Sequence, residues 1–222
     1  EMFKAPLKTL NPLLTATQEY NYKGTENIGA MPFNGIIIAH SNESEWQQFR
    51  ADRKNEAFLD RIHVIKVPYV LRYIDEVKIH LKMLQNSELD GFPIAPRSLE
   101  VLSKISVMTR LFNTENSSLL SKMMVYNGEN MKDKDPKSKS LYEYQTEAGV
   151  DEGMDGFSTR QAFKVCSRAF NLDPDEIALD PLSISIIFTE SVKNDNYSKD
   201  KESHYLSIAE KVMDDELPKL GN

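Results

Sequence analysis

One arginine occupies a helix position where a positive charge is usually unfavourable. The stretch MDGFSTRQAF, residues 154–163, predicts a turn followed by a helix, because Ser158 is a favoured cap and Gln161 completes a capping box. Arg160 falls in the first turn, beside the positive end of the helix dipole. A guanidinium and a helix N-terminus together are suited to binding a polyanion such as phosphate. The alternative is an ordinary solvated arginine, or one that forms an ion pair with a nearby acid: Asp151, Glu152 or Asp155.

Two more polar residues lie next to short apolar runs that are typical of buried strands. Residues 36–38 are all isoleucine, and Asn42 follows them in the cluster HSNE. Arg61 directly precedes a second run, IHVIKV, at 62–67. Ligands of open α/β sheets bind at the carboxyl ends of strands, which makes Asn42 a candidate site residue. Alternatively, Asn42 caps a turn, and Arg61 forms a surface ion pair with its neighbour Asp60.

The elements that must position these residues change in character after residue 72. Before it, the two apolar runs indicate the end of an α/β domain, and residues 20–34 indicate a loop or hairpin. After it, the chain is predicted to be helical, with a polar, mobile loop at 127–156 that contains a short helix at 141–147. Apolar spacing predicts helices at 5–19 (interrupted by Pro12), 52–60, 74–86, 97–112, 117–126, 158–171, 181–194 and 202–216.

Composition excludes several classes of protein. No apolar run approaches the ~20 residues that a membrane-spanning helix needs. The single cysteine, Cys166, permits no internal disulfide, which fits a reducing cytoplasm, and its place on an apolar helix face favours inert packing. The histidines are scattered, and no CxxC or HExxH motif indicates a metal site: His40, His63, His80 and His204.

The charge balance bears on nucleic acid as a partner. The formal net charge of the 222-residue chain is −7, which argues against a broad electrostatic footprint for DNA or RNA. A helix-turn-helix regulator stays an alternative, and an electropositive face around Arg97, Lys104 and Arg110 would favour it.

Eight longer stretches extend over most of residues 1 to about 190: EMFKAP, LLTATQE, PFNGIIIAHSNESEW, NEAFLDRI, KVPY, ENSSLLSKM, AGVDEGMDGFSTR and KVCSRAFN. Together they resemble the PrkA family of bacterial serine protein kinases, which are AAA+ ATPases. The resemblance implies an α/β part followed by a mainly α part. These would be the C-terminal part of an AAA+ αβα sandwich (1–72), a helical lid (73–172) and a helical extension (173–222).

The resemblance also implies a role for each candidate residue. Asn42 would be sensor 1, which positions the attacking water, and Arg61 an arginine finger that reaches the nucleotide of a neighbouring subunit. Arg160 would be the sensor 2 arginine on the γ-phosphate, and Glu1 the acidic residue at the end of the Walker B strand. The cofactors would be ATP and Mg²⁺, the substrate a protein, and the assembly a homo-oligomer in the cytoplasm.

Other motifs of nucleotide-dependent enzymes are missing from the sequence. No GxxxxGK[ST] loop occurs in the 222 residues, so we expect the chain to be a fragment that does not bind ATP tightly alone. No HRD or DFG motif of ordinary kinases is present, so kinase activity is implied by the resemblance only. The alternative function is a non-catalytic helical interaction module formed by residues 73–222.

Overall fold

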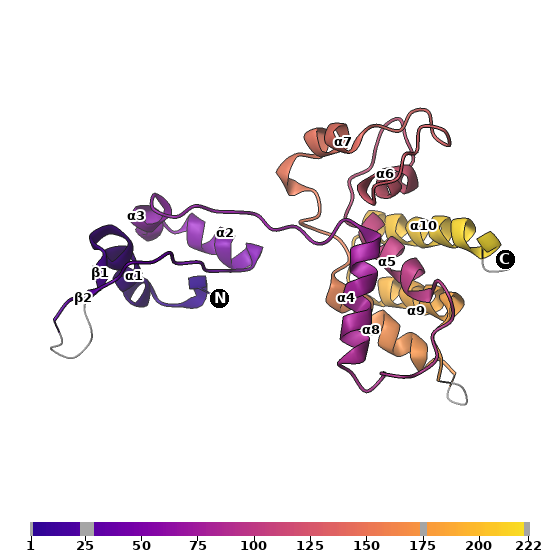
Figure 1. Ribbon diagram of the computed structural model, residues 1–222, viewed down its shortest axis with the longest axis horizontal. Helices are drawn as coiled ribbons and strands as arrows, with labels where there is room; N and C mark the ends of the chain where they lie inside the picture. Colours follow the sequence, from indigo (N-terminus) through magenta and orange to yellow (C-terminus); the bar gives the residue numbers. More distant parts are fainter. Residues whose placement is uncertain (1, 23–28, 174–176, 220–222) are drawn as a thin grey trace. The chain divides into compact units, whose positions relative to one another are not determined.

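The computed structural model describes residues 2–22, 29–173 and 177–219. The chain divides into two compact units, residues 1–65 and residues 66–222. Figure 1 shows the helices and strands of both units. Each unit has its own hydrophobic core.

The first unit begins with a helix and a small hairpin. Helix α1 (Leu7–Glu19) continues through Pro12, where we expected a kink or a restart, although the proline can donate no hydrogen bond to the helix. Strands β1 (Asn21–Tyr22) and β2 (Met31–Pro32) pair antiparallel. This pairing confirms the hairpin predicted within residues 20–34.

The rest of the first unit packs short helices on α1. They are η1 (Met2–Lys4), α2 (Glu43–Ala51), η2 (Arg53–Asn55) and α3 (Glu56–Leu59). Leu10, Phe49 and Phe58 form a small buried core. Phe49 stacks against Phe3 with ring centroids 4.3 Å apart, and its ring meets Phe58 edge-on at 5.5 Å.

The two apolar runs predicted as buried strands do not form strands. Residues 36–38 and 62–67 pair with no strand among the described residues. Ile36 and Ile38 are 89% and 92% exposed, so the run buries little of its apolar surface. A strand is stable only when a neighbouring strand satisfies its backbone groups, and no such neighbour lies in the described ranges. The architecture seen here is therefore mainly helical, with one two-stranded sheet.

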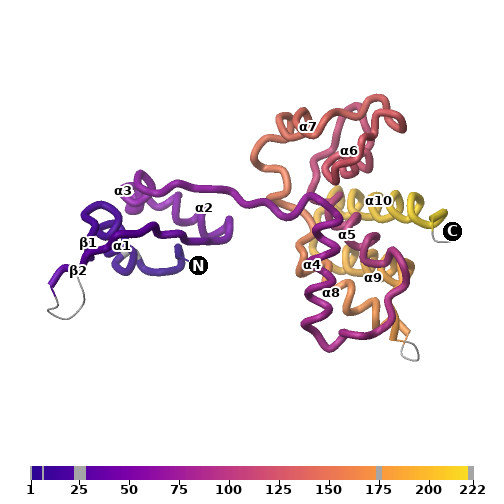
Figure 2. The backbone as a smooth tube through the Cα atoms, viewed as in Figure 1, coloured from indigo at the N-terminus to yellow at the C-terminus, as the bar shows by residue number. Residues whose placement is uncertain are grey.

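The second unit is built from helices that match the predicted ones closely. They are α4 (Tyr73–Gln85), α5 (Ser98–Met108), α6 (Leu119–Tyr126), α7 (Leu141–Ala148), η3 (Gly149–Asp151), α8 (Thr159–Phe170), α9 (Pro181–Asn194), α10 (Lys199–Glu216) and η4 (Leu217–Lys219). In the tube view the chain leaves α7 and returns to the helices around α5 before α8 begins (Figure 2).

Helix α5 forms the centre of the second unit. Every residue of this helix except Glu100 is buried, and it packs against α4, α8, α9 and α10. Five of its apolar side chains have no exposed surface: Val101, Leu102, Ile105, Val107 and Met108. A helix that is buried on all sides must be covered by several others, so α4 to α10 share one core.

Cys166 of α8 belongs to this core. Its side chain is fully buried, and burial raises the pKa of the thiol to about 12. The thiol therefore stays protonated at neutral pH, which confirms the predicted packing role. Within the described residues, no helix is both long and apolar enough to cross a membrane.

Candidate functional site

The N-terminus of α8 has the geometry that the sequence predicted. The Ser158 hydroxyl accepts a hydrogen bond from the backbone N–H of Gln161 at 3.2 Å, and the Gln161 side-chain oxygen accepts one from the N–H of Ser158 at 2.9 Å. The capping box is thus confirmed. The first N–H groups of a helix have no partner within the helix, so those of Thr159 and Arg160 are available to an anion.

The Arg160 side chain is exposed, and the acids that could have neutralised it are engaged elsewhere. Asp151 pairs with Lys66 at 2.5 Å, and Asp155 pairs with Lys201 at 2.7 Å. Glu152 is buried against Lys122. Among the described residues, Arg160 has no hydrogen bond or ion pair of its own. The predicted ion pair with these acids is therefore wrong. The guanidinium is exposed to solvent, as the solvated alternative has it, and is free to meet an anion.

A buried ion pair lies directly beneath this turn. Arg110 and Glu76 have no exposed side-chain surface, and an Nη of Arg110 donates to Oε1 of Glu76 at 2.7 Å. The hydroxyl of Thr159 donates to the same oxygen at 2.9 Å. Arg110 also donates to the carbonyl oxygens of Phe157 and Val70, each at 2.9 Å. One arginine therefore connects α4, the end of α5 and the start of α8.

The turn before α8 lies close against Arg110 because it contains a glycine. Gly156 has a φ of +119°, a conformation that residues with a side chain rarely adopt. A Cβ at this position would lie 2.7 Å from the Thr109 carbonyl oxygen and 2.8 Å from the Arg110 side chain. The Thr109 hydroxyl accepts from the N–H of Phe157 at 2.9 Å, which fixes the same turn from the other side.

The pKa of Glu76 shows which force prevails in this network. Burial acts to raise the pKa, but the hydrogen bond and charge of Arg110 outweigh it and hold the pKa below its usual range. Glu76 is therefore ionised. Its Oε2 nevertheless has no hydrogen-bond partner among the described residues. A buried oxygen without a partner lowers the stability of the folded state.

His80 lies one helical turn after Glu76 and titrates in the same surroundings. Its Nδ1 is 3.1 Å from the Ser103 hydroxyl, and its Nε2 is 3.7 Å from Oε1 of Glu76. Burial lowers the pKa of His80 to about 4; the charge of Glu76 opposes this shift, and the charge of Arg110 adds to it. The imidazole is therefore neutral in the folded protein at neutral pH.

We expect stability to fall as pH drops from about 6.5 to about 4, because the unfolded chain protonates His80 first. The loss is about 3 kcal/mol, from a pKa difference of roughly two and a half units. Denaturant unfolding followed by circular dichroism at several pH values measures it. His80→Gln should flatten the curve in this window, whereas His63→Gln, at an exposed position, should not. An unchanged curve for His80→Gln would contradict the assignment.

Asn42 caps a helix. Its Oδ1 accepts from the backbone N–H of Glu45 at 2.9 Å at the start of α2, and its Nδ2 donates to Oε1 of Glu45 at 3.0 Å. The cap that was the alternative is thus present, and Asn42 is exposed.

Arg61 is exposed in the first unit and does not pair with its neighbour Asp60. It donates to the carbonyl oxygen of Ala57, and its Nε lies 2.6 Å from the side-chain amide oxygen of Gln18 once that amide is oriented to accept. Because its partners are neutral, Arg61 retains its full positive charge for an anion. The fourth candidate, Glu1, lies outside the described residues.

The three cations that could have formed an electropositive face do not form one. Lys104 and Arg110 are buried, and the Lys104 ammonium and the Arg97 guanidinium both contact the carboxylate of Glu216 at 2.5 Å. Burial acts to raise the pKa of Glu216, but Arg97, Lys104 and Lys219 lower it to about 2. These cations are used to fix the end of α10 on α5, so the feature that would have favoured a nucleic-acid regulator is missing.

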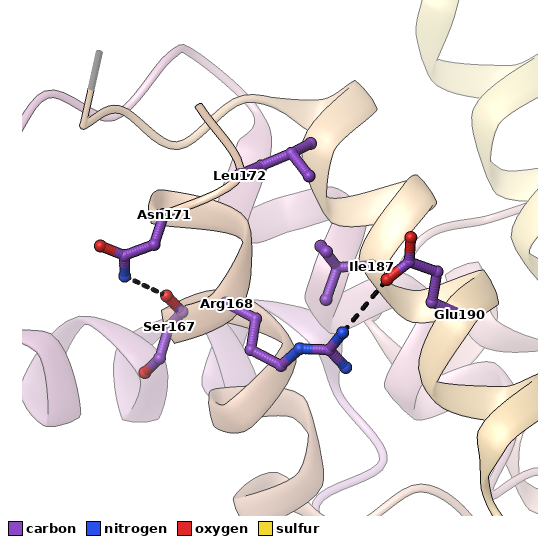
Figure 3. A pocket seen from close by; sticks show the side chains of 6 residues that line it. All are labelled: Ser167, Arg168, Asn171, Leu172, Ile187 and Glu190. Atoms are coloured by element: carbon purple, nitrogen blue, oxygen red, sulfur yellow. Dashed lines mark hydrogen bonds and ion pairs between the residues drawn. The ribbon is translucent and has the colours of Figure 1, made fainter. Parts of the chain in front are cut away.

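A shallow hollow lies between α8 and α9 (Figure 3). It has a volume of about 430 Å³. The Arg168 guanidinium crosses it to Glu190 at 3.1 Å and to the Ser191 hydroxyl at 3.0 Å. Its lining residues are Ser167, Arg168, Asn171, Leu172, Ile187 and Glu190. Since its charged groups pair with each other, the hollow offers a ligand little unmet charge.

Comparison with known proteins identifies the class of this chain. A model of the PrkA AAA domain matches residues 1–118, and a model of the PrkA serine protein kinase C-terminal domain matches residues 120–219. The chain therefore belongs to the PrkA family, as the resemblance predicted. No solved structure matches it significantly.

Two relatives show how the family is named. The serine/threonine kinase YeaG of Escherichia coli K12 is 55% identical over 208 residues, which are 94% of this chain and 32% of that protein. The ATP-dependent protease PrkA of Bacillus subtilis is 32% identical over 220 residues, or 97% of this chain and 34% of that protein. The chain spans about a third of the length of these relatives.

The boundary between the two family models runs through a single hydrophobic core. Helices α4 and α5 lie in the AAA match, whereas α8, α9 and α10 lie in the C-terminal match. Both groups contribute to the same buried cluster, and α5 packs against all three later helices. Arg110 and Glu76 belong to the first match, and Arg160 belongs to the second. The candidate site is therefore built from both.

Proposed function

We propose that this chain is the sensor and lid half of the ATP-binding module of a PrkA-type protein, and that Arg160 contacts the γ-phosphate of ATP. The observation that carries this proposal is an exposed guanidinium at a helix N-terminus, whose neighbouring acids are all paired with other cations. The residues fit a phosphate, because a guanidinium binds its oxygens bidentately and the helix dipole adds to the attraction.

The proposed chemistry is electrostatic. Bound ATP would supply the phosphoryl group, and Arg160 would orient it and balance the charge that develops on its oxygens. Arg61 would act as an arginine finger on the nucleotide of the next subunit, which requires a homo-oligomer. Such a finger is worth about 10³–10⁵ in rate in other nucleotide hydrolases. Asn42 would position the attacking water after releasing Glu45, and Glu1 would polarise it.

The remaining parts of the activity belong to the longer protein. The chain contains no phosphate-binding loop, so we propose that it needs further residues to bind ATP and is inactive alone. The described residues gather no group of three acidic, histidine or cysteine side chains around a metal position, and we assign no Mg²⁺ ligand to them. Phosphorylation of a protein substrate in the cytoplasm is the proposed outcome, as the name of YeaG suggests.

Two other functions have support. The Bacillus subtilis relative is named an ATP-dependent protease, so the same ATP-binding module could serve proteolysis in the longer protein. A non-catalytic interaction module is the second alternative, because α9 leaves Leu182 and Ile186 about half exposed. The first alternative would use Arg160 in the same way, whereas the second assigns Arg160 no role.

Turnover of ATP by the full-length protein tests the proposal. We expect Arg160→Ala and Arg61→Ala each to lower turnover by at least about a hundredfold, since each removes a charge that stabilises the transition state. Arg168→Ala removes an arginine that is paired with Glu190 in the hollow, and it should have little effect. Wild-type turnover by Arg160→Ala would overturn the proposal.

A further inference from the structure

We propose that the buried Glu76–Arg110 pair and the Thr159 hydroxyl are positioning groups that hold Arg160 in place for its anion. The inference rests on the proposed function of Arg160 and adds residues to it. None of the three is exposed as Arg160 is, and none is expected to touch the phosphate itself.

Arg160 is positioned through the backbone of the first turn of α8. The described residues offer its side chain no hydrogen bond or ion pair, so its position depends on the backbone that carries it. That backbone is fixed at the preceding residue, because the Thr159 hydroxyl donates to Oε1 of Glu76 at 2.9 Å. Two residues earlier, the Phe157 carbonyl accepts from Nε of Arg110 at 2.9 Å.

Arg110 fixes this backbone through several hydrogen bonds. Arg110 uses three parts of its guanidinium on three different segments: Phe157, Val70 and Glu76. Its plane also lies over the Tyr69 ring, 5.0 Å from the centroid. A guanidinium with its donors in a fixed fork can define an orientation that a lysine cannot.

The buried Glu76–Arg110 pair has a free-energy cost. A buried ion pair is weak evidence for stability, because apolar residues of similar size often serve as well. Here Oε2 of Glu76 has no partner, and His80 is kept neutral beside it. Thr159 and Arg110 converge on the other oxygen, Oε1. The fold thus retains a buried carboxylate, which is costly to desolvate, at the position where it fixes the first turn of α8.

The positioning groups also connect the two family models. Glu76 and Arg110 lie within residues 1–118, whereas Thr159 and Arg160 lie within residues 120–219. A movement of Arg160 on gain or loss of the γ-phosphate would therefore act directly on α4 and α5. This network is the direct route by which the site and the central helix would influence each other.

The test compares four variants of the full-length protein: Thr159→Val, Thr159→Ser, Arg160→Ala and the double variant Thr159→Val with Arg160→Ala. ATP turnover is measured, together with affinity for a fluorescent ATP analogue, which needs no turnover. We expect Thr159→Val to lower both about tenfold, the equivalent of one hydrogen bond to a charged group. Thr159→Ser keeps the hydroxyl and should retain both. In the Arg160→Ala background, Thr159→Val should have no further effect.

Ser106→Ala is the matched control. It removes another buried hydroxyl, which donates to the Leu102 carbonyl at 2.8 Å and, among the described residues, forms no hydrogen bond with the turn before α8. It should lower the melting temperature about as much as Thr159→Val does, without changing turnover or affinity.

The outcomes separate the two proposals. If Arg160→Ala impairs the protein but Thr159→Val does not, or if Thr159→Val has the same effect in both backgrounds, the positioning role is wrong and the proposed function stands. If Arg160→Ala leaves turnover and affinity unchanged, the proposed function fails, and the positioning role fails with it.

Discussion

Residues 120–222, produced without the residues before them, are expected not to fold. This segment is the match to the C-terminal domain model, but it lacks α4 and α5. The missing α5 provides core side chains with no exposed surface, among them Leu102, Ile105 and Met108. At about 1.5–3 kcal/mol each, the five fully buried apolar side chains of α5 contribute about 8–15 kcal/mol, which is as large as the 5–15 kcal/mol that a domain typically has in reserve.

Circular dichroism and thermal unfolding test this expectation directly. Residues 66–222 form the matched control, because they include α4 and α5 together with the later helices. We expect that control to melt in one cooperative transition and the shorter segment to show none. Cooperative unfolding of residues 120–222 alone would mean that the domain boundary between the family models is also a structural boundary, contrary to the shared core.

Replacing Arg110 by methionine is expected to destabilise the second unit by about 3–5 kcal/mol, the usual cost of leaving a buried charge without its partner. The carboxylate of Glu76 would lose its 2.7 Å contact and keep only the Thr159 hydroxyl. The double variant Glu76→Leu with Arg110→Met should recover much of the loss, because no buried charge is then left unpaired.

The control for this prediction is the ion pair between Arg168 and Glu190. Each side chain of that pair is about half exposed, and the distance is 3.1 Å. Arg168→Met should therefore cost no more than about 1 kcal/mol, as surface pairs usually do. Denaturant unfolding of residues 66–222 measures both variants. An equal loss of unfolding free energy for Arg110→Met and Arg168→Met would show that the buried pair contributes no more to stability than an exposed pair.

Local signals in the sequence were sufficient to predict most of the helices. Helix α8 begins at the predicted capping box. Helix α9 begins at Pro181, directly after Asp180, whose carboxylate accepts a hydrogen bond from the N–H of Ser183 at 3.0 Å. These signals work because caps involve residues only two or three positions apart. The length of α5 was overestimated, since the helix ends at Met108 and the side chains of Thr109 and Arg110 form hydrogen bonds with Phe157 in the segment before α8.

The apolar runs at 36–38 and 62–67 could not be interpreted correctly from local pattern. Strand formation depends on a partner strand, and a run of isoleucines does not reveal whether one is present in the same chain. Ile36 and Ile38 therefore fit the pattern of a buried strand and are exposed in the structure. The hairpin at 21–32 was easier, because both of its strands lie within one predicted loop.

The candidate site was predicted only in part. Arg160 and its cap were identified from a helix rule, but Glu76, Arg110 and Thr159 were missed as a group. Arg110 is 34 residues from Glu76 and 49 from Thr159 in the sequence, and no local pattern connects positions so far apart. The available signals were weak: an acid near the start of a helix, and an arginine at the end of an otherwise apolar one.

The affinity of the full-length protein for ATP and for ADP, with and without Arg160→Ala, is the measurement that tests the central claim most directly. If Arg160 contacts the γ-phosphate, the variant should bind ATP about tenfold or more weakly and bind ADP as the wild type does, because ADP lacks that group. An equal loss of affinity for both nucleotides, or no loss for either, would contradict the claim that Arg160 contacts the γ-phosphate.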